Sequence, residues 1–303
     1  DMIITLPLIE CLKRRFPKAR ITYFMSTPYS LQNPESGGRI LENNPFVSEW
    51  VEADITALRT VVDSPSYDLA IDLSLKRKFS DLLCYLSGAE VKIWGKFRAI
   101  PRNFFWSRRL RSGQWDRREK VKIPAGLSRV DQFCTPARSL GARCSGILVP
   151  KIYLSRFEKD LAADFLKQAA DGDHALIGFH PGSMSRQERL WNARSYAAVA
   201  DHVAGQLGAC PVLFHGAMEK ALAKKIVRWS KHGIKTVFEK DLRKLFSKIS
   251  ACRFFITTDG GQLHMALSLG VPCVGLFTRK DIVRYWYKPY IRQGLLLPVE
   301  ING

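Results

Sequence analysis

The chain has 303 residues, of which 46% are hydrophobic and 25% are charged, a composition typical of a globular protein with a sizeable core. We find no run of about 18 consecutive apolar residues, so the sequence predicts no transmembrane helix, and we expect no signal peptide. The formal net charge of +19 indicates an anionic partner, which the charge alone leaves open between nucleic acid, an anionic membrane and an anionic small substrate.

The seven cysteines are scattered along the chain, and none belongs to a C-x-x-C pair. An odd number of isolated cysteines favours free thiols in a reducing compartment over a disulfide framework or a zinc site. The sequence therefore predicts a cytoplasmic protein without a metal site.

Helices and strands alternate along the first half of the chain. Residues 2–19 predict a helix with Ile9, Leu12 and Phe16 on one face, and Pro17 ends it. The segments that follow predict strand 20–26, a short helix and a strand within 39–53, strand 67–74, helix 80–89, strand 91–95 and helix 127–142.

The alternation restarts in the second half. The predicted elements are helix 156–169, a strand within 171–183, helix 193–208, strand 210–216, helix 219–230, strand 235–239, helix 241–252, strand 253–259, helix 262–270 and strand 271–277. Alternation of this kind predicts a parallel sheet with helices on both faces. Two units of similar size indicate two doubly wound domains that meet near residues 150–156.

Three strand ends in the second half carry polar or glycine-rich corners: "HPGS" at 180–183, "HGAME" at 215–219 and "DGGQLH" at 259–264. Ligands of doubly wound domains bind at the carboxyl ends of strands, so the three corners together outline a pocket. Taken alone, each corner is more typical of an ordinary link between a strand and a helix.

The third corner suits a phosphate. Its glycines allow positive φ angles and a close approach of backbone N–H groups, and they precede a helix whose free N–H groups and dipole favour an anion. Asp259 is expected to cap this helix, and His264, one turn later, is expected to face the same phosphate. Glu219 in the second corner suits either ribose hydroxyls or the dipole of its own helix.

Residues 96–122 are dense in positive charge, with ten basic and two acidic residues and with phenylalanines and tryptophans between them. A solvated surface segment explains this pattern as well as a site for phosphorylated or membrane-bound material does.

Several stretches resemble glycosyltransferase family 9, the lipopolysaccharide heptosyltransferases. Residues 177–203 resemble the family's strand, "HPG", "K-x-W-P" and helix, and "FFITTDGGQLHMALSLGVPCVGLF" resembles its "D-[ST]-G-x-x-H-x-A-x-x-L-x-x-P" stretch. Residues 1–26 resemble the segment that follows the family's first strand and its Gly-Asp turn, and residues 67–95 fit the next recognisable stretch. The resemblance runs in order over nearly the whole chain.

The resemblance implies an α/β fold of GT-B type, with two Rossmann-like doubly wound domains facing each other across a cleft. Residues 1–153 would bind the acceptor, and residues 154–303 would bind the nucleotide sugar. The last helix would return to the first domain. The family's first strand would lie upstream of Asp1, so we expect the natural chain to be longer at this end.

The resemblance also implies the reaction. The donor is ADP-L-glycero-β-D-manno-heptose, and the acceptor is the Kdo/heptose–lipid A inner core of lipopolysaccharide at the cytoplasmic face of the inner membrane. The transfer inverts the anomeric centre and needs neither a metal nor a cofactor. Peripheral attachment to the anionic inner membrane would explain the positive charge. Nucleic acid is not expected as a partner.

The catalytic residues implied are Asp1 and Arg189. Asp1 matches the family's general base, although aspartate there would also suit a helix N-cap. Arg189 matches a lysine that stabilises the diphosphate leaving group. Arg189 keeps the charge of that lysine but changes its geometry. Asn192 and Gly260 also depart from the family pattern, since they replace a proline and a serine or threonine.

The remaining site residues follow from the same match. The donor side comprises Ser183 and Arg189 at the phosphates, Glu219 at the ribose, Lys240 within the segment 238–242 at the adenine, and Asp259, Gly260, Gly261 and His264 at the diphosphate and sugar. The acceptor side comprises Lys76, Arg77 and Arg98.

Three alternatives stay open. The same fold could use another nucleotide sugar or a protein acceptor, as the departure at Gly260 allows. The basic segment 96–122 and the net charge are compatible with a nucleic-acid-binding protein, although no motif of that class occurs. An inactive relative would bind ADP without turnover.

Overall fold

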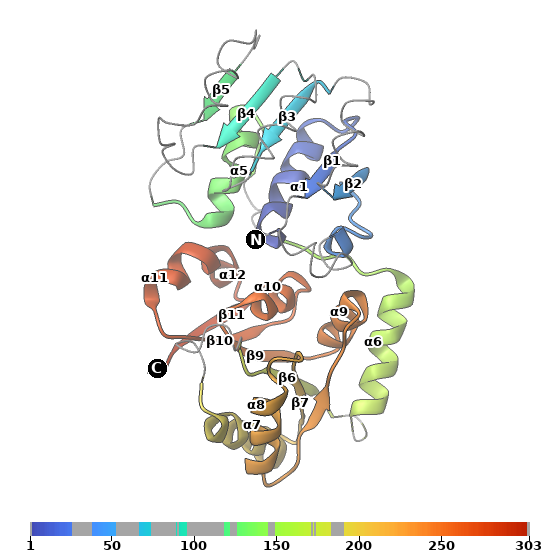
Figure 1. Ribbon diagram of the computed structural model, residues 1–303, viewed down its shortest axis with the longest axis vertical. Helices are drawn as coiled ribbons and strands as arrows, with labels where there is room; N and C mark the ends of the chain where they lie inside the picture. The colour runs from blue at the N-terminus through green and yellow to red at the C-terminus, as the bar shows by residue number, and fades with distance from the viewer. Residues whose placement is uncertain are drawn as a thin grey trace.

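The computed structural model describes residues 2–25, 38–52, 67–73, 89, 91–95, 118–121, 126–144, 149–170, 172, 174–182 and 191–301. Figure 1 shows these residues in two parts, which we call the first half (up to residue 144) and the second half (from residue 149). Both contain parallel strands and helices, so the predicted α/β class is confirmed. The domain bounds 1–153 and 154–303 stay a prediction.

The second half is built on one six-stranded sheet with the order β11-β10-β9-β6-β7-β8. Every neighbouring pair in it is parallel. The strands are β6 (Leu176–His180), β7 (Cys210–Phe214), β8 (Lys235–Val237), β9 (Phe254–Thr258), β10 (Cys273–Phe277) and β11 (Leu296–Glu300). The first five match predicted strands, whereas β11 was not predicted.

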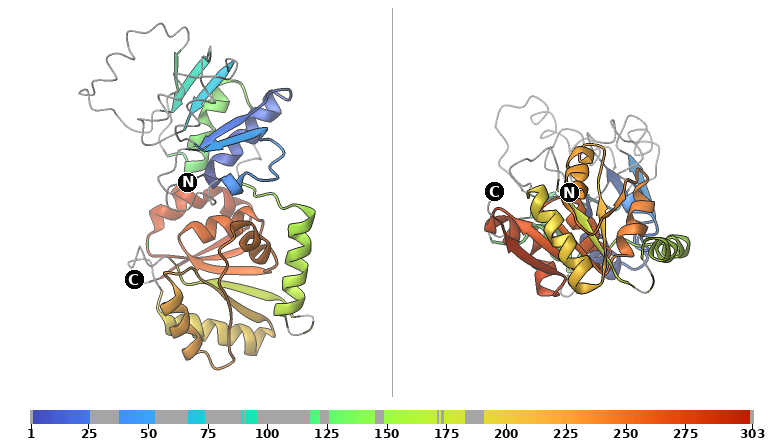
Figure 2. Two further views of the ribbon diagram at one scale, coloured as in Figure 1. Left: turned by 45° about the vertical axis from the view of Figure 1, so that its right-hand side comes forward. Right: turned by 90° about the horizontal axis from the view of Figure 1, so that it is seen from below.

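Helices cover both faces of this sheet, as Figure 2 shows. They are α6 (Arg156–Ala169), α7 (Ala193–Leu207), α8 (Lys220–Trp229), α9 (Leu242–Ser250), α10 (Gly261–Ser268), α11 (Lys280–Ile282), the π-helix η4 (Val283–Tyr287) and α12 (Lys288–Arg292). One hydrophobic cluster lies on each face of the sheet. One joins the sheet to residues of α6, α9, α10 and α12, and the other joins it to residues of α7 and α8.

Alternate residues of the central strands point to opposite faces, as the geometry of a strand requires. Leu176 belongs to the first cluster and Ile177 to the second. Between such residues, Gly178 lets the ring of Phe255 approach closely, since a Cβ added at Gly178 would lie 2.4 Å from that ring. Because these strands are buried on both faces, their sequences are nearly continuous runs of apolar residues.

The described strands of the first half form two separate parallel sheets instead of the single sheet expected. β1 (Thr22–Met25) pairs with β2 (Glu49–Glu52), and β3 (Leu69–Asp72), β4 (Val91–Gly95) and β5 (Arg118–Val121) form the other sheet. β5 lies in the basic segment and was not predicted as a strand. The helix predicted at 80–89 lies almost wholly outside the described residues.

Helix α1 (Leu6–Arg15), preceded by the 3-10 turn η1 (Ile3–Thr5), packs against α5 (Arg129–Ser139). Their shared cluster contains Leu8 and Cys11 from α1 and Val130 and Phe133 from α5. Ser128 caps α5 by accepting a hydrogen bond from the backbone N–H of Asp131, 3.3 Å away. Among the described residues of the first half, the larger hydrophobic cluster is thus centred on the contact between these two helices.

Arg243 forms a buried ion pair within the second half and also contacts the first half. The guanidinium of Arg243 on α9 donates to both carboxylate oxygens of Glu158 at 2.6 and 2.7 Å. Arg243 also donates to the backbone carbonyls of Arg39, at 3.0 Å, and Tyr153, at 2.6 Å. Arg39, within the 3-10 turn η2 (Gly38–Ile40), donates to Asp241 at 2.7 Å. One arginine of the second half therefore holds segments of both halves.

Candidate functional site

The strand order of the six-stranded sheet brings the three polar corners together. From β6 the chain moves to β7 and β8 on one side, and it then returns to β9, β10 and β11 on the other side. β6 and β9 are neighbours, so the order reverses between them. Doubly wound sheets bind ligands outside the carboxyl ends of the strands at such a reversal. The corners that follow β6, β7 and β9 flank this position.

The two glycines at the start of α10 differ from expectation. Gly260 is the N-cap and has extended backbone (φ 171°, ψ −172°), and Gly261 is not among the glycines with positive φ. The expectation that these glycines serve positive φ angles is therefore wrong. Among the described residues, and apart from the helix's own backbone, a Cβ added at Gly261 would meet no atom within 4 Å, and one at Gly260 would meet only Gln262 Oε1, at 3.6 Å. This open space leaves the N–H groups of the first helical turn accessible to an anion.

Asp259 is held by a tyrosine from the C-terminal segment. The Tyr287 hydroxyl donates a hydrogen bond of 2.6 Å to Asp259 Oδ1. The N-cap of α10 is Gly260, without a side-chain cap, so the expectation that Asp259 caps this helix is wrong. Tyr287 is fully buried. Burial, followed by the charge of Asp259, raises the pKa of Tyr287 well above its usual value, so the phenol stays protonated and able to donate.

His264 lies one turn into α10 and stacks on the same tyrosine. The two ring centroids are 4.7 Å apart with an interplanar angle of 14°. His264 is half-buried, but its Nδ1 is shielded from solvent and has no hydrogen-bond partner among the described residues. Burial lowers the pKa of His264 to about 4, although the negative charge of Asp259 acts to raise it. The ring is therefore neutral near pH 7. His264 is a hydrogen-bonding group here and does not supply positive charge.

The corner after β7 combines a carboxylate with an exposed aromatic ring. Glu219 is buried at the N-cap of α8, and its Oε2 accepts a hydrogen bond of 3.1 Å from the backbone N–H of Gly216. His215 stacks on Phe238 with ring centroids 5.7 Å apart, and Phe238 is 49% exposed. The Lys240 ammonium lies 5.9 Å from the centre of the Phe238 ring. Phe238 thus offers a flat apolar surface beside a cation.

The described part of the corner after β6 is held by hydrogen bonds. His180 is buried, and its Nδ1 accepts a hydrogen bond of 3.1 Å from the backbone N–H of Gly182. The φ of 88° at Gly182 is a value that favours glycine. The Tyr196 hydroxyl donates to the His180 carbonyl at 3.1 Å. Burial, and then the charge of His215, lower the pKa of His180 to about 3, so this histidine is also neutral near pH 7.

The structure places five predicted donor residues at two of these corners: Glu219, Asp259, Gly260, Gly261 and His264. Lys240 lies just after β8, on the side of β7. The other predicted site residues lie outside the described residues, namely Asp1, Lys76, Arg77, Arg98, Ser183 and Arg189. Their roles stay predictions.

Sequence reasoning missed Tyr287 and the stacking of His215 on Phe238. Tyr287 lies 28 residues after Asp259, in a π-helix, and such turns often occur at functional sites. The aromatic content of residues 285–290 was the only signal in the sequence. The structure also explains Asn192, whose side chain caps α7 by accepting a hydrogen bond of 2.8 Å from the backbone N–H of Ser195.

Within the described ranges, no helix combines the length and the apolar character needed to cross a bilayer.

Comparison with known proteins identifies the fold and the family. The chain is 25% identical over 293 residues to lipopolysaccharide heptosyltransferase 2 of Salmonella typhimurium, with 91% of this chain and 79% of that protein covered. A glycosyltransferase family 9 structure from Veillonella parvula superposes with a TM-score of 0.79 at 22% identity, covering 99% of this chain and 82% of that one. The structure of the E. coli ADP-heptose lipopolysaccharide heptosyltransferase II superposes with a TM-score of 0.71 at 20% identity, covering 99% of this chain and 86% of that one.

These structures share the α/β architecture of GT-B type that the sequence resemblance implied, so the predicted fold class is confirmed. The sequence pattern of the family "Glycosyltransferase family 9 (heptosyltransferase)" matches residues 55–294, which is most of the chain. The match covers the corners after β6, β7 and β9. The chain therefore belongs to glycosyltransferase family 9, the heptosyltransferases, and is a glycosyltransferase.

Proposed function

We propose that the chain transfers a heptose from ADP-heptose to the Kdo/heptose–lipid A inner core of lipopolysaccharide, with inversion at the anomeric carbon and without a catalytic metal. Family membership and the name of the Salmonella relative support the sugar and the acceptor. The observation that carries the donor site is the open N-terminus of α10 at the reversal of the strand order.

In this proposal, the diphosphate of the donor binds at the first turn of α10. The N–H groups there have no helical partners, and the helix dipole adds partial positive charge. The open space at Gly261 would allow phosphate oxygens to approach the backbone. Neutral His264 would add a hydrogen bond from its imidazole and no charge.

Asp259 has a different role, because a carboxylate repels phosphate and accepts hydrogen bonds from hydroxyl groups. We assign it to hydroxyls of the donor sugar. The bond from the buried Tyr287 fixes the rotamer of Asp259 before the donor arrives, and such preorganisation reduces the entropy lost on binding. Tyr287 is thus a positioning residue for the donor.

The corner after β7 would hold the nucleoside. The carboxylate of Glu219, which accepts from the backbone N–H of Gly216, suits hydrogen bonds from ribose hydroxyls. Phe238 offers an exposed ring backed by His215, on which adenine could stack. Lys240 beside that ring would face the anionic nucleotide.

The reacting groups are carried over from the family resemblance. Asp1 would take the proton of the acceptor hydroxyl as that oxygen attacks the anomeric carbon. Arg189 would stabilise the charge that develops on the departing diphosphate, in place of a metal ion. Lys76, Arg77 and Arg98 would bind acidic groups of the acceptor. The net charge of +19 would favour peripheral attachment at the cytoplasmic face of the anionic inner membrane.

A transfer assay tests the proposal. The chain is incubated with ADP-heptose and lipid A carrying either Kdo alone or Kdo and heptose, and mass spectrometry follows the acceptor. We expect one of the two acceptors to gain one heptose, with inverted configuration by NMR. We also expect the rate to be unchanged by added Mg²⁺ or Mn²⁺. ADP release without any modified acceptor would contradict the proposed acceptor class.

One observation favours a second candidate, which is transfer from another nucleotide sugar. Gly260 replaces the serine or threonine that the family pattern has, so a hydroxyl is missing beside the donor sugar. The same assay, run with UDP-, GDP- and CDP-sugars, decides between the two. Faster transfer from one of these than from ADP-heptose would replace the proposed donor and retain the fold and the site.

A further inference from the structure

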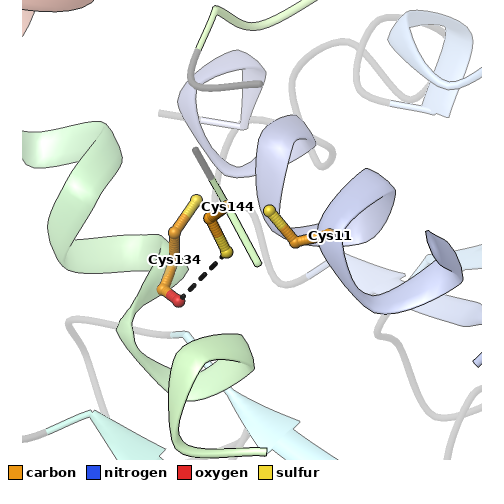
Figure 3. A group of neighbouring side chains, drawn as sticks. All are labelled: Cys11, Cys134 and Cys144. Atoms are coloured by element: carbon orange, nitrogen blue, oxygen red, sulfur yellow. Dashed lines mark hydrogen bonds between the residues drawn. The ribbon is translucent and has the colours of Figure 1, made fainter. Parts of the chain in front are cut away.

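Three cysteines that are distant in sequence converge in the core of the first half. Cys11 lies on α1, Cys134 lies on α5, and Cys144 follows α5. Their sulfur atoms all lie within 4.8 Å of one another, and each residue is at most 3% exposed. Figure 3 shows the three side chains gathered in the space between the two helices.

The surroundings of these thiols offer them few strong partners. Ile4, Leu8, Val130 and Ala137 belong to the same apolar cluster. The Cys144 thiol donates only long hydrogen bonds to described carbonyls, at 4.0 Å to that of Cys134 and 3.9 Å to that of Ala142. An apolar core needs no such sulfur cluster, whereas three convergent sulfurs are the ligands that soft metal ions prefer.

We infer that Cys11, Cys134 and Cys144 bind a thiophilic d10 cation, Zn²⁺ or Cu⁺, as three thiolates. Zn–S bonds of about 2.3 Å at tetrahedral angles place neighbouring sulfurs about 3.8 Å apart. The sulfurs lie within 4.8 Å of one another, so an approach of about 1 Å at most would bring the three sulfurs to this spacing. Each thiol that binds the metal releases its proton.

The local charge favours Zn²⁺ over Cu⁺. Three thiolates in an apolar core carry three negative charges, which is unfavourable unless they are compensated. Zn²⁺ leaves one negative charge and Cu⁺ leaves two. Arg138, one turn after Cys134 on α5, interacts electrostatically with both Cys134 and Cys144. Arg138 is also ion-paired with Asp131, with a nitrogen–oxygen distance of 2.8 Å, so the zinc form is favoured because it leaves the smaller uncompensated charge.

The bound ion would have a structural role. It would link α1 to α5 and to the turn that ends at Cys144, the contacts on which the first half depends. The donor corners belong to the second half, so this inference is independent of the proposed transfer reaction and of its metal-free chemistry. The expectation of no metal site came from spacing in the sequence, which could not show that Cys11 and Cys134 meet.

The test measures metal bound to the full chain under reducing conditions. The protein is loaded separately with Zn²⁺ and Cu⁺ and dialysed, and metal content is determined by mass spectrometry. Co²⁺ is used as a spectroscopic probe of thiolate ligation. We expect about one Zn²⁺ per chain, a thiolate-to-Co²⁺ charge-transfer band, and loss of both in Cys144→Ala. Cys252→Ala, which removes a buried cysteine of the second half, is the matched control and should keep both.

Wild-type protein alone can overturn the inference, so a variant that fails to fold does not block the test. Substoichiometric Zn²⁺ and Cu⁺ after loading, together with Co²⁺ spectra that lack the thiolate band, would show three packed thiols and no site. Equal metal content in the Cys144→Ala variant and in wild type would place the metal elsewhere. One Cu⁺ per chain with no retained Zn²⁺ would keep the site and overturn the charge argument.

Discussion

The two halves of the molecule are stabilised in different ways. The second half has one continuous sheet covered on both faces, and its candidate site residues directly follow the strands. The described first half has two small sheets, and its core is the contact between α1 and α5 around three sulfur atoms. The donor corners follow strands of the second half, although the first half contacts their surroundings. Ile3 of η1 clusters with Met265 of α10 and with Leu269 just after it, and Arg129 of α5 donates to Tyr285. We expect nucleotide binding to be nearly independent of the packing between α1 and α5.

Paired core substitutions test this independence and should have the largest effect. Phe255 and Phe133 are both buried, one in each half. Replacement of either by alanine should cost about 3–5 kcal/mol of unfolding free energy in its own half. Urea unfolding combined with ADP titration should show weaker ADP binding in Phe255→Ala, where the sheet loosens, and unchanged binding in folded Phe133→Ala. Equal loss of ADP binding in both variants would show that the halves act as one unit.

Arg243→Ala removes the buried ion pair with Glu158 and the hydrogen bond to the Arg39 carbonyl of the first half. The variant leaves the Glu158 carboxylate, whose side chain is 9% exposed, without its charged partner. We expect a loss of about 3 kcal/mol in the free energy of unfolding, because a buried charge is left unpaired. Lys244→Ala, which changes an exposed neighbour, is the control and should change stability little. Similar unfolding midpoints for the two variants would contradict a structural role for this pair.

Acid should destabilise the second half through His264. Its pKa is about 4 in the folded protein and about 6.5 when unfolded, so protonation favours the unfolded state. The stability present above pH 6.5 is lost as the pH falls towards 4, by about 2 kcal/mol after allowance for the partial exposure of the residue. Urea unfolding at several pH values should show this loss in wild type and a smaller one in His264→Gln. Parallel pH profiles would refute the assignment of a buried neutral ring.

Tyr287→Phe should have the smallest of these effects. The substitution removes only the hydroxyl that donates to Asp259, and the lost bond to a carboxylate is worth about 1.5 kcal/mol. We expect KM for the sugar donor to rise about tenfold while the Kd of ADP stays nearly constant. Tyr290→Phe removes another buried hydroxyl, bonded to Ser268, and serves as the control. A donor KM equal in the two variants would exclude a positioning role for Tyr287.

The sequence predicted most elements of the second half, because buried parallel strands and amphipathic helices leave strong periodic patterns. The two missed strands are both at sheet edges. β5 is largely charged, and β11 contains Pro298, and both features are typical of edge strands.

The candidate site was predictable where it depends on short motifs and not where it depends on distant contacts. Asp259 and His264 stand out in the sequence, but their shared partner Tyr287 does not. Gly260 and Gly261 were predicted at the site because glycine allows positive φ angles, but neither adopts one. They instead leave open space beside the first turn of α10. The convergence of Cys11, Cys134 and Cys144 is set by helix packing, which no local pattern encodes.

The most direct test of the donor site is calorimetric titration of wild type, Gly261→Asp and Gly261→Ser with ADP, UDP, GDP and CDP. Aspartate in the first turn suits the helix dipole and meets open space, so Gly261→Asp should fold well. It would nevertheless place a carboxylate where we locate the diphosphate. We predict that wild type prefers ADP, that Gly261→Ser still binds it, and that Gly261→Asp loses about 100-fold or more in affinity. ADP binding of wild-type strength in a folded Gly261→Asp variant would contradict the proposed donor site.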